Sequence, residues 1–139
     1  MAALIAKSKH RSGAALVELA IALPILLLLT LGLIEYGWVF LRVSQINQAA
    51  RQGVRVAVRP DATESQINSN VSSLMNQAGL GNSGYQLTHT NIGVAVGQPV
   101  TVQINVNYGP LSLTGTSLVP LPGQLQGRAT MAKEGPPSP

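Results

Sequence analysis

The acidic residues and histidines of this chain are too few and too scattered to suggest a catalytic or metal-binding set. The sequence has two histidines, His10 and His89, five acidic residues and no cysteine. Isolated histidines without nearby thiols or paired acids supply neither a metal site nor a base with its nucleophile. Asp61 and Glu64 have the spacing of a helix start with a capping box. We therefore expect no enzyme activity, no cofactor, no metal ion and no small-molecule substrate.

One carboxylate, that of Glu18, lies inside a strongly apolar stretch. A charged side chain costs about 2.5 to 3.5 kcal/mol at the centre of a bilayer and less toward its edge, so Glu18 requires a partner. If the chain were cut between Gly13 and Ala14, the new amine of Ala14 would lie one helical turn from Glu18. The two charges could then neutralise each other, within the chain or between subunits. Alternatively, Glu18 extends to the lipid headgroups.

The apolar stretch itself, residues 14–41, predicts a membrane-spanning helix. Residues 19–34 carry no charge, and Glu35 is the only charged interruption before residue 41. About 20 apolar residues suffice to cross a bilayer, and we place the span at residues 16–41. A buried core helix would need a larger domain to cover it, and a cleaved secretory signal would end in small residues. Pro24 should kink or loosen the helix.

These N-terminal residues resemble a known family. A basic leader, Gly13, Glu18 and then an apolar helix are similar to the cleavage site of the type IV pilin superfamily. The stretch from residue 13 to residue 58 more closely resembles the TadE-like proteins, minor pilins or pseudopilins of Tad (Flp-type) pilus systems. Leu19 stands where many pilins have an aromatic residue, which argues against a major pilin. The matching positions are Gly13, Glu18, Pro24, Glu35, Gly37, Ala49, Ala50, Arg51, Gly53 and Arg55, with a looser likeness at Tyr108, Pro110 and residues 127–134.

The resemblance implies a function in pilus assembly. A prepilin peptidase would cleave between Gly13 and Ala14, and the protein would lie in the bacterial inner membrane with a cytoplasmic N-terminus and an extracytoplasmic C-terminal domain. Its partners would be this peptidase, other pilin-like subunits, Tad assembly platform proteins and the lipid bilayer. Glu35, Arg51 and Arg55 are candidate contacts to partner proteins. The alternative, of a different class, is an uncleaved single-pass scaffold that binds other envelope or secretion-system components.

The distribution of charge fits this orientation and excludes nucleic acid. The formal net charge is +4, and most of the excess lies in the leader, in Lys7, Lys9 and Arg11. Basic residues before a span favour a cytoplasmic N-terminus, although Arg42 follows the span directly. Without its leader the chain is nearly neutral, so a nucleic-acid surface is not indicated. The lack of cysteine means that no disulfide forms.

The helical pattern continues beyond the span, over residues 42–59, with two rows of residues on opposite faces. A row of small residues at intervals of four allows close approach to another helix or to a sheet. A row of arginines is displaced by two positions, or roughly 200°. The arginines contact a partner or lipid phosphates, or form a solvated face. The rows are Ala49, Gly53 and Ala57, and Arg51, Arg55 and Arg59.

The remainder of the chain predicts a second helix and three strands. Pro60 ends the long helix, and a second helix begins at Asp61 or Thr63 and ends at Gly79. Its apolar face would consist of Ile67, Val71, Leu74 and Ala78. After Gly84 the apolar period changes to two, which predicts an irregular strand region over residues 85–96, a strand over 100–108 and a third over 125–131. Residues 97–99 would form the turn of an antiparallel hairpin.

Together these elements predict an α+β, pilin-like fold. A long N-terminal transmembrane helix would continue into a small periplasmic domain with a short second helix and an antiparallel sheet of about three strands. The small-residue face of the long helix, with Pro24 as a bend, would provide the packing surface. The expected divisions are a leader at 1–13, the long helix at 14–59, an extracytoplasmic domain at 60–132 and a disordered tail at 133–139.

Overall fold

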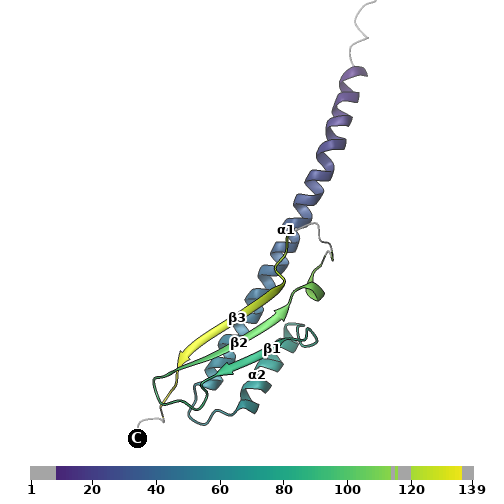
Figure 1. Ribbon diagram of the computed structural model, residues 1–139. Coiled ribbons are helices and arrows are strands. Elements are labelled where there is room, and N and C mark those ends of the chain that lie inside the picture. The colour runs from purple at the N-terminus through teal and green to yellow at the C-terminus, as the bar shows by residue number, and fades with distance from the viewer. Residues whose placement is uncertain (1–8, 114, 116–119, 136–139) are drawn as a thin grey trace, which may run out of the picture.

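The computed structural model describes residues 9–113, 115 and 120–135, with side chains from residue 13 onward, and it has the predicted α+β architecture (Figure 1). A long helix extends from one end of a small domain, in which a second helix and a three-stranded sheet pack on its outer half. The elements are α1 (Lys9–Ala57), α2 (Glu64–Gln77), β1 (Gln86–Thr90), β2 (Pro99–Asn107), the 3-10 helix η1 (Gly109–Leu111) and β3 (Gln124–Ala132).

Helix α1 begins earlier than predicted. We expected an irregular leader and a helix from about Ala14, but residues 9–13 are already helical. This prediction was wrong because Lys9 and Arg11 are good helix formers, and Gly13 costs only about 1 kcal/mol within a helix. The rest of the predicted leader, residues 1–8, lies outside the described residues. The helix continues through Pro24.

The C-terminal end of α1 is capped by the C-terminal part of the chain. The helix ends at Ala57, shortly before Pro60, and Lys133 Nζ donates to the carbonyls of Ala57 (3.2 Å) and Arg59 (2.6 Å). A cation at this end stabilises the partial negative charge of the last carbonyls. The Glu134 N–H also donates to the Val58 carbonyl. Lys133 and Glu134, which we assigned to a disordered tail, therefore belong to the packed domain, while residues 136–139 lie outside the described residues.

Helix α2 is capped at both ends, by Thr63, one of its two predicted starts, and by a motif at the predicted C-terminal glycine, Gly79. Its N-cap is Thr63, whose hydroxyl accepts from the Gln66 N–H while the Gln66 side chain accepts from the Thr63 N–H. The predicted Asp61 and Glu64 box was wrong, because Pro60 and the residues after it form a turn before the helix begins. At the other end Gly79, with φ of 69°, allows the Leu80 N–H to reach the Met75 carbonyl. This is a Schellman motif.

The sheet has the order β1-β2-β3, with both pairs antiparallel. Strand β2 alternates as predicted: Val100, Val102, Ile104 and Val106 are buried, and polar side chains point to the opposite, more open face. The third strand is confirmed as β3. The first strand is shorter than the predicted 85–96 region, because Asn91 adopts a positive φ of 64° that ends the extended conformation after Thr90.

The sheet packs its apolar face on α1 and α2, and the core lies between these two layers. Two glycines allow the close approach. A Cβ on Gly53 of α1 would lie 2.7 Å from Val71 Cγ2 of α2 and 3.2 Å from Val102 Cγ1 of β2. A Cβ on Gly127 of β3 would lie 2.8 Å from the carbonyl carbon and oxygen of Ile46. At Gly127, β3 therefore approaches the backbone of α1. At Gly53, which belongs to the predicted small-residue row, α1 approaches side chains of α2 and β2.

Candidate functional site

The first half of α1 stands clear of the domain and exposes its apolar side chains (Figure 1). The helix is long and apolar enough to cross a membrane, and its most hydropathic window has no buried residue. A core helix of the same composition would be covered, so that alternative does not apply to the described structure. This feature fits a single-pass membrane protein. The exposed side chains include Leu16, Val17, Leu19, Ile21, Leu23, Ile25, Leu26, Leu27, Leu28, Leu29, Leu31, Leu33 and Ile34.

The predicted cleavage residues lie near the start of this exposed segment. Gly13, Ala14 and Glu18 are all exposed and all helical. Glu18 follows Ala14 by four positions, so the two residues lie on the same side of the helix. The Glu18 residue and the backbone nitrogen of residue 14 are therefore about one turn of α1 apart.

Glu35, in contrast, is fully buried, with 0% of its surface exposed. Its Oε1 accepts from the Tyr108 hydroxyl and, at 3.2 Å, from the Leu113 N–H. Buried carboxylates require such donors because their desolvation is costly. We expected Glu35 to contact a partner protein; this was wrong, because the carboxylate is covered by its own chain.

Two further residues on the same part of α1 tie the helix to other segments. The Trp38 Nε1 donates to the Leu111 carbonyl at 2.8 Å. The Arg42 Cζ lies 4.2 Å from the centre of the Trp38 ring, and Arg42 Nη1 donates to the Ala78 carbonyl at 2.7 Å. Ala78 is the C-cap of α2, so a cation again meets the negative end of a helix.

We call these residues the junction cluster. It comprises Glu35, Trp38 and Arg42 of α1 together with Tyr108, Leu111, Leu113 and Ala78. Tyr36 of α1 adds a further link, since its hydroxyl donates to the Pro120 carbonyl at 2.7 Å. The cluster lies where the uncovered half of α1 meets the domain (Figure 1), and it joins α1 to α2 and to both ends of the β2–β3 connection.

The electrostatics of the cluster keep the Tyr108 hydroxyl protonated. Burial raises the pKa of Tyr108 above its ordinary value, and the hydrogen bond to Glu35 and the charge of Glu35 raise it further, whereas Arg42 acts in the opposite direction. A protonated phenol can donate to a carboxylate, which a phenolate cannot. The cluster is therefore suited to holding the helix and the domain in one orientation, and it carries no arrangement for catalysis.

The two predicted rows on the outer half of α1 face opposite ways, as expected. Ala49, Gly53 and Ala57 are buried against α2 and the sheet. Arg51, Arg55 and Arg59 are exposed on the other side, where they are accessible to a partner, to lipid phosphates or to water.

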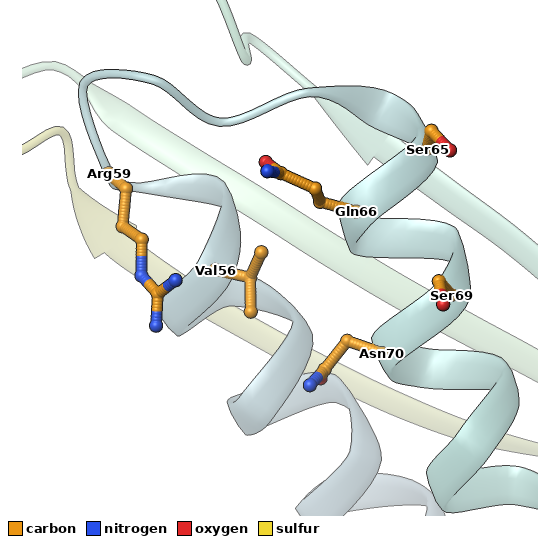
Figure 2. A pocket seen from close by; sticks show the side chains of 6 residues that line it. All are labelled: Val56, Arg59, Ser65, Gln66, Ser69 and Asn70. Carbon is orange, nitrogen blue, oxygen red and sulfur yellow. The ribbon is translucent and has the colours of Figure 1, made fainter.

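A polar groove runs between α1 and α2 and opens into a cleft of about 470 Å³. Figure 2 shows Val56 of α1 and Arg59, which lies just after the end of α1, beside Gln66 and Asn70 of α2. Ser65 and Ser69 lie on α2 as well. The Asn70 Oδ1 is buried and has no hydrogen-bond partner among the described residues. Of the described residues that line this cleft, Arg59 alone is titratable. Among the described residues no group of three histidines or acids could hold a metal ion.

Sequence reasoning missed Tyr108, Trp38 and Arg42 as members of a site. Two signals were available. Glu35 is a carboxylate in an otherwise apolar run, so it needed donors, and Tyr108 ends the strongest predicted strand. Trp38 and Arg42 are four positions apart, the spacing at which helical neighbours stack.

Comparison with protein families gives one match, which covers most of α1. The model of the TadE family, described as TadE-like protein, matches residues 13–55. The match begins at Gly13 and includes Glu18, Glu35 and Gly53, and it confirms the resemblance found in the sequence. Comparison with characterised proteins and with solved structures gave no significant match.

Proposed function

We propose that this chain, a TadE-like protein over residues 13–55, is a minor pilin or pseudopilin that assists assembly of a Tad (Flp-type) pilus. The observation that carries the proposal is the exposed apolar half of α1, which is joined to a small domain by the junction cluster. An apolar helix of this kind can lie in a bilayer and can also pack sideways on the helices of other subunits. The role is structural and requires no catalysis.

In this proposal the chain is first inserted as a single-pass protein of the inner membrane, with its N-terminus in the cytoplasm. A prepilin peptidase removes the leader between Gly13 and Ala14. The Glu18 carboxylate then pairs with the amine of Ala14, in the same subunit or in a neighbour, which lowers the cost of placing a charge in an apolar layer. The exposed Arg51 and Arg55 are available to the assembly platform or to other pilin-like subunits.

The cleavage step is tested by replacing Gly13 with leucine in a strain that carries the pilus system. We expect the wild-type protein to begin at Ala14 and the Gly13→Leu protein to keep its leader, as determined by N-terminal sequencing of the membrane fraction. Gly37→Leu is a matched control, because Gly37 is also exposed in α1 and a Cβ there, as at Gly13, meets no atom within 4 Å. A wild-type protein that begins at Met1 or Ala2 would instead support the uncleaved scaffold.

The pairing role is tested with Glu18→Ala in the same strain. We expect fewer surface filaments at an unchanged amount of membrane-inserted protein, counted by electron microscopy. Glu64→Ala serves as the control, since Glu64 is an exposed acid on α2, far from the apolar segment. Normal filament numbers in the Glu18 variant would contradict the pairing.

A further inference from the structure

The end of the domain that faces the free half of α1 exposes apolar side chains. Outside α1, the large apolar residues that the structure describes as exposed are Leu113, at 53%, and Val96, at 63%. They lie at opposite ends of the domain. On α1, Tyr36 and Phe40 are exposed beside the junction cluster, Phe40 to 76%.

Hydrogen bonds fix which residues of α1 lie beside Leu113. Its N–H donates to Glu35, the preceding Leu111 accepts from Trp38, and Pro120, farther along the same connection, accepts from Tyr36. The β2–β3 connection is thus held beside residues 35–38 of α1 at two places.

Residues 35–38 of α1 directly follow the free apolar segment. The uncovered residues 14–34 end before the span that we expected at 16–41, because from Glu35 onward α1 contacts the domain. They extend over about 30 Å at 1.5 Å per residue, which equals the thickness of the hydrocarbon layer. If they cross the bilayer, Glu35 lies at its boundary, and Phe40 lies within about one and a half helical turns beyond it. Tyrosine and tryptophan favour this interface, and Tyr36 and Trp38 are both present there.

The composition of the β2–β3 connection suits the same environment. Within this connection, residues 108–123, Leu111, Leu113 and Leu121 provide apolar surface.

Building on the membrane span of the proposed function, we infer that this end of the domain is a lipid contact. Leu113, together with Tyr36 and Phe40, inserts into the boundary between headgroups and acyl chains on the side of the bilayer where the domain lies. The domain therefore rests on the membrane instead of standing away from it, and the junction cluster fixes it in that position.

The chain has no cysteine, so single cysteines can be introduced for spin labelling of the full-length protein. Leu113→Cys, Val96→Cys and Leu27→Cys would each be labelled with a nitroxide in lipid nanodiscs that hold one copy. Collision rates with oxygen, which concentrates in lipid, and with a water-soluble nickel complex would then be compared. Val96 is a suitable control because the adjacent Gly97 N–H donates to the Lys133 carbonyl at the far end of α1.

We expect the oxygen-to-nickel ratio at Leu113 to exceed that at Val96 several-fold and to approach that at Leu27, which lies within the span. Equal ratios at Leu113 and Val96, with Leu27 still shielded from nickel, would overturn the lipid contact and leave the span intact. A nickel-accessible Leu27 would overturn the span and the contact together. Shielding of Leu113 that appears only in vesicles with many copies would assign the surface to a neighbouring subunit, which also overturns the lipid contact.

Discussion

At the scale of single residues, the two acids of the apolar region have opposite environments. Glu18 is exposed on a helix with no cover, whereas Glu35 is fully buried and accepts from Tyr108 and Leu113. Hydrogen bonds within the chain offset the desolvation cost of the buried Glu35 carboxylate. For Glu18 the donor must come from a new N-terminus, from another molecule or from lipid headgroups.

The bond from Tyr108 to Glu35 gives a prediction for stability and its dependence on pH. Tyr108→Phe should lower the free energy of unfolding by about 1–3 kcal/mol at neutral pH, because it removes a donor from a buried carboxylate. The raised pKa of Tyr108 means that the folded protein retains a proton that the unfolded chain loses above pH of about 10. This contribution is present below that pH and is lost as the pH rises through the folded pKa.

The measurement is denaturant unfolding in mild detergent, followed by near-ultraviolet circular dichroism from neutral to alkaline pH. We expect the difference between wild type and Tyr108→Phe to shrink as the pH rises above about 10. Phenolate absorbance provides an independent check, since the last of the three tyrosines to ionise should disappear in the variant. Equal stability of the two proteins at neutral pH would show that the bond does not hold the junction.

At the scale of elements, the contact of α1 with the rest of the domain depends on two glycines. Gly53 faces side-chain methyl groups of Val71 and Val102, while Gly127 faces the backbone of Ile46. Side chains can move by a few tenths of an ångström, but a helix backbone can move only as a unit. The two positions should therefore differ in their tolerance of an added methyl group.

A series of alanine substitutions tests this packing. Gly53→Ala should destabilise the domain by about 1–3 kcal/mol through overpacking. Gly127→Ala should cost more than Gly53→Ala, because β3 or α1 must shift as a whole. Gly37→Ala should be neutral or stabilising by up to about 1 kcal/mol, because its Cβ meets no atom and alanine favours a helix. Thermal unfolding gives the order, and a Gly127→Ala protein as stable as wild type would contradict the close approach of β3 to α1.

At the scale of the whole molecule, α1 has two halves with different surroundings. Up to Ile34 its large side chains are exposed, and from Glu35 onward one face of the helix is packed against the domain. The buried core consists of residues from Ile46 to Leu125, so none of it comes from the first half of α1.

This division predicts that residues 35–139 fold without the apolar segment. The fragment retains the buried residues of the core and every hydrogen bond of the junction cluster, and Glu35 in its first turn is favourable at a helix N-terminus. We expect a cooperative thermal transition and a far-ultraviolet circular dichroism spectrum with both helical and strand contributions. A fragment without a cooperative transition would show that the first half of α1 contributes to the stability of the domain.

The sequence by itself determined the elements and their surface character. The apolar run, the alternation in β2 and the glycine after α2 are local patterns. The element that each pattern forms depends only on residues close to it in the sequence. For the same reason the two faces of α1 could be assigned before any contact was known. The TadE-like resemblance also rests on one continuous stretch.

Only the tertiary structure decided which groups meet at the junction. Glu35 and Tyr108 are 73 positions apart, as are Trp38 and Leu111, and no periodicity connects them. Their pairing depends on how the sheet lies across α1, which is set by the close approaches at Gly53 and Gly127. The exact ends of α1 and α2 also depend on tertiary contacts, such as the hydrogen bonds from Lys133 to the carbonyls at the C-terminal end of α1.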